Sequence, residues 1–525
     1  MAICLRYGYL RGGALRTGHG IFPSNAAALV LASFLMLAAL LPAGCTVGPA
    51  FRRPQTPVTN RYTAAALPGK TENAPVAGGA AQCFKPGEDI PAKWWKLFHC
   101  RELDLLVRMG IAQSRTLPAA RAALRQAYEN ERSQAGALLY PKVDATASAV
   151  RQKFSGAAFG EPGAPGIIFN LFNASAAVSY MFDLFGGSRR ELEALGAQVD
   201  YQRFQLEGAY IALTANIVTA AVQEASLRAQ ISVTRKILAD QEDQLRIVKL
   251  QLGLGGASRP DVLAQMAQLA QTRAGLPPLE KALSHTRHQM AVLTGVLPSN
   301  SGGLPEIDLD SLHLPQRLPL SLPSMLLRRR PDIRASEALL HAASAQIGVA
   351  TANMLPQITF TGSIGTETAR VEDIFGKDTS IWSLGMSFLQ PLFHGGELKA
   401  KRRAAVDAYE QALAQYQEAV LEAFQNVADS LRALDRDAGT LKAQAQAWAV
   451  AKDSLDVTRK QFQLGAVSYL QLLNAQRQYQ LARISLVQAQ AARFADTAAL
   501  FQALGGGWWQ RKFSAVADVA AGGAK

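Results

Sequence analysis

The motif Leu184-Phe185-Gly186-Gly187 occurs a second time as Leu392-Phe393-His394-Gly395-Gly396, 208 residues later (392 − 184). Two further motifs recur in the same order, one shifted by 215 residues (356 − 141) and one by 210 (465 − 255). They are Tyr140-Pro141-Lys142-Val143 with Leu355-Pro356-Gln357-Ile358, and Gly255-x-x-Ser258-x-x-Asp261-x-Leu263 with Gly465-x-x-Ser468-x-x-Gln471-x-Leu473. Self-similarity of this kind indicates a duplicated unit. We therefore expect two internal structural repeats, 96–300 and 326–505, joined by a linker at 301–325.

Each repeat has the pattern of a very long helix followed by a second one. In the second repeat, apolar positions recur with a mean spacing of 3.5 residues (28/8): Val406, Tyr409, Leu413, Tyr416, Val420, Phe424, Val427, Leu431 and Leu434. A sustained period of 3.5 specifies coiled-coil packing. We predict long helices at about 188–252, 258–296, 397–464 and 468–503, with a break at Pro277-Pro278. At ~1.5 Å per residue, a helix of roughly 60 residues reaches ~90 Å, so the molecule must be elongated.

Four strands are expected, at about 141–151, 168–182, 356–366 and 379–391. Val143, Ala145, Ala147 and Ala149 alternate with polar residues, and so do Ile381, Leu384, Met386 and Phe388. Such alternation places lipid on one face of a strand and water on the other, although a half-buried strand of a soluble protein looks the same. A membrane barrel needs at least about eight strands and has no open edge in lipid. Four strands per chain therefore imply that several chains share one barrel.

Composition excludes several classes. The chain has 525 residues, of which 49% are hydrophobic and 18% charged, and after position 44 no apolar run approaches the ~20 residues of a membrane-spanning helix. A multi-span helical transporter is therefore excluded. The net charge of +13 is spread along helix faces without the stacking aromatics that nucleic-acid binding needs, so it indicates a solvated surface.

The first residues have the order of a secretory signal. A basic start is followed by an apolar stretch at 26–41 and by Leu41-Pro42-Ala43-Gly44-Cys45, so we predict a signal peptide at 1–44. Cys45 after Ala-Gly resembles a lipobox, in which the cysteine is acylated, with palmitate among the expected chains, although Pro42 stands where Leu is usual. Cleavage without lipidation is the alternative. Thr46, where Asp would favour retention in the inner membrane, indicates the outer membrane.

These features together resemble the outer-membrane efflux (TolC-like) family, in particular the lipoprotein subgroup that serves resistance-nodulation-division pumps. The resemblance rests on the start at Cys45, on Trp94-Trp95-Lys96-Leu97-Phe98, on Arg329-Arg330-Pro331-Asp332-Ile333-Arg334-Ala335 and on Ala503-Leu504-Gly505-Gly506-Gly507-Trp508. It implies a homotrimer with a 12-stranded outer-membrane barrel above a long coiled-coil helical barrel. It also implies an equatorial collar that includes the lipidated segment 45–95 and the C-terminal tail 506–525.

The implied function is a passive export duct for small molecules, associated with multidrug resistance, with a periplasmic adaptor and an inner-membrane pump as partners. The alternative is the outer-membrane duct of a type I protein secretion system. A coiled-coil adaptor would have long helices but would lack the paired strands. No enzyme activity and no cofactor are expected, because no phosphate-binding loop, Gly-x-Ser-x-Gly or His-Glu-x-x-His is found.

Other candidate sites follow from individual residues. Cys83 and Cys100 remain once Cys4 is removed and Cys45 is lipidated, so we predict a disulfide between them, which would contribute about 3 kcal/mol; two free thiols are the alternative. His285 and His288 share a helix face but lack a third metal ligand, so no metal site is expected. Arg329, Arg330, Asp332 and Arg334 are interpreted as a helix start that docks on its neighbours.

The family resemblance places a periplasmic gate where the paired long helices turn, at 253–261 and 465–471. Relatives often carry acidic residues at the second turn, whereas Phe462 to Asn474 contains none. We therefore expect Leu464, Val467 and Tyr469 to form an apolar constriction. Asp261 is the remaining candidate for an acidic ring, with a helix cap as the alternative.

Overall fold

The computed structural model describes residues 46–55, 59, 61–155 and 165–511. The predicted signal peptide and Cys45 lie outside the described residues. Two units with the same order of elements follow one another. The first comprises α3 (Thr116–Leu139), β2 (Lys142–Phe154), β3 (Ile167–Phe182), α4 (Gly187–Gly253), α5 (Arg259–Ala274) and α6 (Leu276–Leu293). The second comprises α8 (Pro331–Ala352), β5 (Gln357–Thr368), β6 (Ser380–Leu389), α9 (Glu397–Gln463) and α10 (Tyr469–Ala503).

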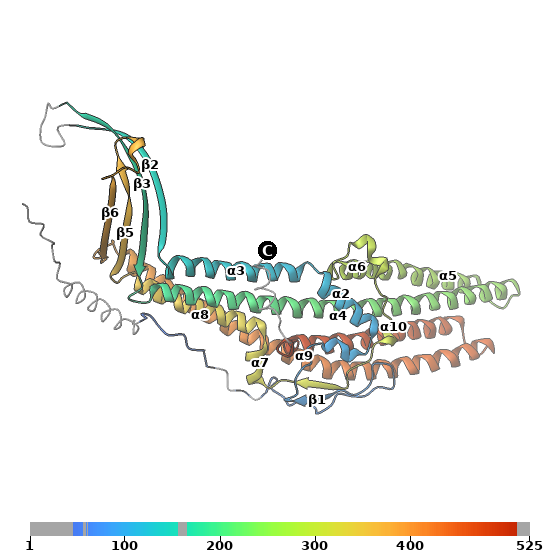
Figure 1. Cartoon of the computed structure of the whole chain (residues 1–525). Coiled ribbons are helices and arrows are strands. Elements are labelled where there is room, and N and C mark those ends of the chain that lie inside the picture. The colour runs from blue at the N-terminus through green and yellow to red at the C-terminus, as the bar shows by residue number, and fades with distance from the viewer. Residues whose placement is uncertain (1–45, 56–58, 60, 156–164, 512–525) are drawn as a thin grey trace, which may run out of the picture.

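The long helices give the molecule its elongated shape (Figure 1). Helices α4 and α9 have 67 residues each, which corresponds to ~100 Å at ~1.5 Å per residue. Both begin after a glycine in the left-handed conformation, Gly186 and Gly396, where a side chain would be strained. In the first unit the return segment divides at Gly275, just before Pro277-Pro278, whereas α10 is continuous.

The four long strands form one antiparallel sheet in the order β2-β3-β5-β6, at one end of the helices (Figure 1). Register places Val143, Val178, Gly362 and Leu384 on one face, and Thr146, Ser175, Ser363 and Ser383 on the other. The first face continues along β6 through Trp382, Met386 and Phe388, which are 64–77% exposed. Trp382 therefore belongs to this apolar face, and the assignment of Ile381 to it was wrong because neighbouring strand residues point to opposite sides.

Shorter elements lie beside the middle of the long helices (Figure 1), and we refer to them as the collar. They are β1 (Cys83–Pro86), η1 (Trp94–Phe98), α2 (Arg101–Gln113), η3 (Pro298–Gly303), η4 (Leu309–Ser311), β4 (Arg317–Leu320), α7 (Pro323–Arg329) and η6 (Trp508–Gln510). Strands β1 and β4 pair in parallel. Trp94 and Phe98, both nearly fully buried, pack on α10 through Phe501 and Phe494, so the N-terminal part of the chain is fixed to its last helix.

The predicted mainly helical architecture with a β part is confirmed. The predicted strands 141–151, 168–182, 356–366 and 379–391 correspond to β2, β3, β5 and β6. The predicted helix 258–296 corresponds to α5 and α6 together, because Gly275 separates them. Within the described ranges, no helix combines the length and hydrophobicity needed to cross a bilayer.

Candidate functional site

The far end of the helices, away from the sheet, consists of two turns with the same geometry. Gly255 and Gly465 both have positive φ, 80° and 73°, and in each turn the next residue donates its N–H back to the helix, Gly256 to Gln251 at 2.7 Å and Ala466 to Gln461 at 2.8 Å. Such a hydrogen bond closes the helix C-terminus. The recurring Gly-x-x-Ser motif therefore builds two equivalent hairpins, α4–α5 and α9–α10.

Each turn ends in a capping box on the next helix. The Ser258 side chain accepts from Asp261 N, and the Asp261 carboxylate accepts from Ser258 N at 2.9 Å and Ser258 Oγ at 2.6 Å. Ser468 and Gln471 form the same arrangement at the start of α10. A capping box satisfies helix donors that would otherwise lack partners. In this conformation Asp261 caps α5, which was the alternative to an acidic gate.

Tyr469 lies inside the molecule, so its predicted place in an exposed constriction was wrong. It is only 6% exposed, its ring packs on Phe462 with centroids 5.5 Å apart, and its hydroxyl donates to Gln265 Oε1 at 2.5 Å. It belongs to a tip cluster with Val248, Val262, Leu455, Leu472 and Leu473. Burial raises the pKa of Tyr469, and the nearby Asp261 carboxylate adds to the rise. The cluster holds the two hairpins together.

The tip surface is apolar at its ends. Leu464 is 84% exposed and its counterpart Leu254 is 88% exposed, and each follows the last residue of a long helix. Val467, three residues after Leu464, is half-buried. The role of Leu464 in a constriction therefore stays a prediction, and Leu254 is an equally exposed apolar residue that the sequence analysis did not name.

Cys83 and Cys100 are free thiols, so the predicted disulfide is wrong. Cys83 belongs to β1, where it is paired with Arg317 of β4. Cys100 precedes α2, and its Sγ contacts Glu102 Oε2 at 3.4 Å and Ser311 Oγ at 3.6 Å. The two thiols are therefore held by different collar elements. The disulfide was predicted only because Cys4 and Cys45 had other expected fates, and that argument contains no information on where Cys83 and Cys100 lie in the fold.

The segment 329–334 begins α8 and contacts α10 and α9, which agrees with the predicted helix start that docks on its neighbours. Pro331 lies in the first turn of α8 and Asp332 provides its early negative charge. Arg330 donates to the carbonyl oxygens of Ala503 at 3.0 Å and Ala423 at 3.4 Å, and pairs with Asp332 at 2.6 Å. The arginine thereby satisfies a carbonyl at the C-terminus of α10.

An N-terminal strap, residues 46–53, contacts both α4 and α8. Arg190 donates to the carbonyl oxygens of Val47 and Gly48 at 3.1 and 3.3 Å. Phe51 stacks on His341 with ring centroids 4.4 Å apart. Gly48 approaches α8 so closely that a side chain there would come within 2.4 Å of the Gly348 Cα. Thr46, the first described residue, lies against Gly186, where β3 has just ended.

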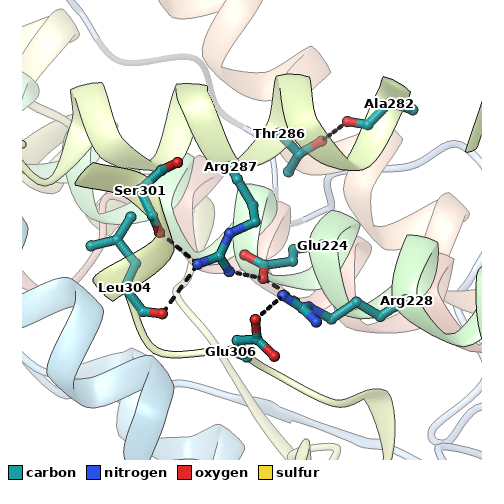
Figure 2. A network of polar contacts seen from close by, with 8 residues as sticks. All are labelled: Glu224, Arg228, Ala282, Thr286, Arg287, Ser301, Leu304 and Glu306. Atoms are coloured by element: carbon teal, nitrogen blue, oxygen red, sulfur yellow. Dashed lines mark hydrogen bonds and ion pairs between the residues drawn. The ribbon is translucent and has the colours of Figure 1, made fainter. Parts of the chain in front are cut away.

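A buried ionic network joins α4, α6 and the linker at collar level (Figure 2). Glu224, 1% exposed, accepts from Arg287 at 2.6 Å and from Arg228 at 2.9 Å. Arg287 also donates to the carbonyl oxygens of Ser301 at 2.6 Å and Leu304 at 3.2 Å, and Arg228 pairs with Glu306 at 2.7 Å. The network fixes residues 301–306 to the helices. The sequence reading did not single out any of these side chains.

Comparison with known proteins shows which family has this architecture. The family model for outer membrane efflux proteins matches residues 106–296 and 322–506. The chain belongs to the outer membrane efflux protein family. It is 34% identical to the pyoverdine export outer membrane protein OpmQ of Pseudomonas aeruginosa, over 79% of this chain and 87% of the relative. It is 28% identical to the probable efflux pump outer membrane protein TtgC of Pseudomonas putida, over 91% and 96% of the two chains.

Among solved structures, the outer-membrane channel OprN resembles this protein with a TM-score of 0.78 and 28% identity, covering 88% of this chain and 100% of that one. As an outer membrane efflux protein, the chain is a channel subunit, with the sheet in the outer membrane and the long helices in the periplasm. The predicted family, location and channel function are confirmed. The tip formed by the two turns is accordingly the periplasmic end of the duct.

Proposed function

We propose that three copies of this chain close into a passive efflux duct. The observation that carries the proposal is the sheet, which has two chemically different faces and two edges, β2 and β6, that pair with no further strand among the described residues. An open edge in lipid leaves backbone groups without partners, and four strands are fewer than the about eight of the smallest membrane barrels. Three copies, with four strands each, would supply twelve strands and pair every edge.

The two faces support this arrangement. One carries apolar side chains, including Trp382 at 77% and Leu384 at 82% exposure, which suits the acyl chains of the outer membrane. The other carries hydroxyl groups that bond across strands, Thr146 with Ser175 at 3.1 Å and Ser363 with Ser383 at 2.8 Å. Hydroxyl groups facing inward would line a water-filled passage.

The helices extend the same plan. Contacts place them in the order α3-α4-α8-α9, with α3 against α4, α4 against α8 and α8 against α9. The flanks formed by α3 and α9 therefore continue the sheet edges β2 and β6. Closing the ring through both flanks would produce a helical tunnel beneath the barrel.

The strap supports an anchoring role for Cys45. Because Thr46 lies against Gly186, shortly beyond the end of β3, an acyl chain on the preceding residue would reach the inner surface of the outer membrane. Mass spectrometry of membrane-extracted protein should show a diacylglyceryl-modified peptide beginning at Cys45. An unmodified N-terminus at another residue would reject the anchor.

The family and the duct geometry support a tripartite efflux system, in which a periplasmic adaptor and an inner-membrane resistance-nodulation-division pump supply energy and small-molecule substrates. The chain itself would catalyse no reaction and need no cofactor, because a passive duct requires only an aqueous path and a gate. Its relatives are named for pyoverdine export and for an efflux pump, which favours small molecules over secreted proteins.

Two measurements test the proposal. Native mass spectrometry in mild detergent should give a particle of three mature chains, each lighter than the 56.3 kDa full-length chain by the removed signal peptide; a monomer with an intact sheet would reject the assembly. Deletion of the gene should raise intracellular accumulation of at least one class of dye or antibiotic, and a plasmid copy should reverse this. Unchanged accumulation together with loss of a secreted protein would instead indicate the protein secretion duct.

A further inference from the structure

Two large apolar residues are exposed where the sheet joins the helices. Leu392 and Phe393, which follow β6, are 91% and 86% exposed. Their counterparts in the first repeat, Leu184 and Phe185, follow β3 and are partly buried. These two line a pocket together with Pro356, the residue before β5. The internal joint between β3 and β5 therefore covers an apolar pair whose repeat is left exposed beside β6.

Residues suited to cover the exposed pair lie at the opposite edge of the sheet, beside β2 (Figure 1). In the repeat, Pro356 corresponds to Pro141, the residue before β2. Its neighbours Leu139 and Tyr140 are 46% and 67% exposed. The two edges of one chain thus carry the same two surfaces that meet inside the chain between β3 and β5. A second copy of the chain is the partner that brings these surfaces together.

We propose that β6 of one copy pairs with β2 of the next in the register of the internal joint, so that Met386 lies directly opposite Ala147 of the next copy. In the internal joint Val178 lies opposite Gly362. The repeat shifts transfer this pair to the edges, because 178 + 208 = 386 and 362 − 215 = 147. The inference rests on the proposed duct of three chains and goes beyond it by stating which residues meet between two chains.

The lengths and faces of the strands agree with this register. Residue numbers of opposite partners add up to 533 (386 + 147), so the ten residues of β6, 380–389, lie opposite residues 153–144 of the next copy, all within β2. Met386 is on the apolar face of Leu384, and Ala147 is on the same face through Val143. A displacement by one residue would place apolar side chains on the polar face.

The register also closes a ring with an ordinary strand tilt. From Ala147, the pairs within one chain lead to Ala174, Thr366 and Ser380, and Ser380 then lies opposite Lys153 of the next copy. The path therefore advances by 6 residues per chain (153 − 147) and by 18 in three chains (3 × 6). With ~3.3 Å per residue and ~4.8 Å between strands, this is ~59 Å along the strands over ~58 Å around twelve strands. The tilt is about 45°, within the range of membrane barrels.

Pairings displaced by two residues keep the apolar face and are the alternatives. With Met386 opposite Ala149, the same construction gives a tilt of about 54°, beyond the range of membrane barrels. With Met386 opposite Ala145, the tilt is about 35°, which a barrel accepts. That pairing, however, moves Leu392 by about 7 Å along β2 away from Pro141. The proposed register is the one that brings Leu392 level with Pro141 (533 − 392), as the internal joint brings their counterparts into one pocket.

Cysteine cross-linking of the assembled protein tests the register. Opposite residues of antiparallel strands have Cα atoms about 4.5–5.5 Å apart, which a disulfide spans, whereas a displacement by two residues exceeds its reach of about 7 Å. Met386→Cys combined with Ala147→Cys should give chains linked to one another on non-reducing gels. Met386→Cys combined with Ala145→Cys or with Ala149→Cys should give no link. The three double variants differ only in the position of one Ala→Cys change, so they are matched controls.

Two further double variants complete the design. Val178→Cys with Gly362→Cys joins the internal pair and should give a linked peptide within one chain by mass spectrometry. Ser387→Cys with Thr146→Cys has the proposed register on the polar face (387 + 146 = 533) and should also link neighbouring chains. The single-cysteine variants measure the background from the native thiols.

A link through Ala145→Cys or Ala149→Cys as strong as the link through Ala147→Cys would overturn the register. Absence of a link at all three positions, with the internal pair linked, would overturn it as well. In both cases native mass spectrometry would still show three chains, so the proposed duct would stand. A monomer without links between chains would overturn the register and the duct together.

Discussion

Tyr469 Oη and Gln265 Oε1 are joined by a 2.5 Å hydrogen bond that links the first turn of α10 to α5 across the tip. Gln265 is fully buried and Tyr469 nearly so, and Gln265 also donates to the carbonyl oxygen of Gln241 on α4 at 2.9 Å. The bond therefore connects both hairpins, and the tip closes through a polar contact inside an apolar cluster.

Replacing Tyr469 by Phe should lower stability without changing the pore. The ring stays in the cluster while Gln265 Oε1 loses its partner, which costs about 1–3 kcal/mol for a buried acceptor. We expect a lower urea unfolding midpoint and unchanged single-channel conductance. Leu464→Ser is the matched variant, because Leu464 is 84% exposed; it should alter conductance and leave the midpoint unchanged. A changed conductance with an unchanged midpoint in Tyr469→Phe would instead show that Tyr469 lines the pore.

Glu224→Gln should be among the most destabilising single changes in the helical region. The carboxylate is 1% exposed and contacts both Arg287 and Arg228, and removing one partner of a buried charge costs about 3–5 kcal/mol. Glu72→Gln is the control, since its exposed pair with Lys442 should contribute less than about 1 kcal/mol. Equal unfolding midpoints for the two variants would show that the network does not stabilise the collar.

The sequence predicted the positions of the helices and strands well and the contacts between distant side chains poorly. The 3.5-residue period and the paired Gly-x-x-Ser motifs determine where α4 and α9 end, because these signals are local. Which way Tyr469 faces depends on Gln265, 204 residues away. The partners of Arg493 in the collar are more than 400 residues away. No local sequence pattern encodes such contacts. The sequence therefore predicted Tyr469 in the lining of the pore, and it did not indicate that Glu224 and Arg493 are buried.

Cys83 and Cys100 should both react with an alkylating reagent in denatured, unreduced protein. In the native state Cys100 should react much more slowly, because it is 5% exposed and burial raises the pKa of its thiol, which lowers the thiolate fraction. Cys83 is only half-buried and serves as the internal comparison. Mass spectrometry of the labelled peptides measures the reaction. If neither cysteine is labelled in the denatured protein, the two cysteines form the disulfide after all.

The gate prediction follows from what the two tip turns lack. Asp261 is engaged in capping α5 through Ser258, and residues 462–474 carry no acid, whereas the apolar Leu254 and Leu464 lie at the tip surface. An apolar constriction blocks ions by dewetting.

Val467→Asp should add three symmetry-related carboxylates in the trimer and create block by divalent cations. Asp261→Ala should change conductance only modestly while costing about 1 kcal/mol of stability as a lost cap. Planar-bilayer recordings of the wild type and both variants separate the cases: strong divalent block in the wild type that disappears in Asp261→Ala would show that Asp261 leaves its cap and forms an acidic gate.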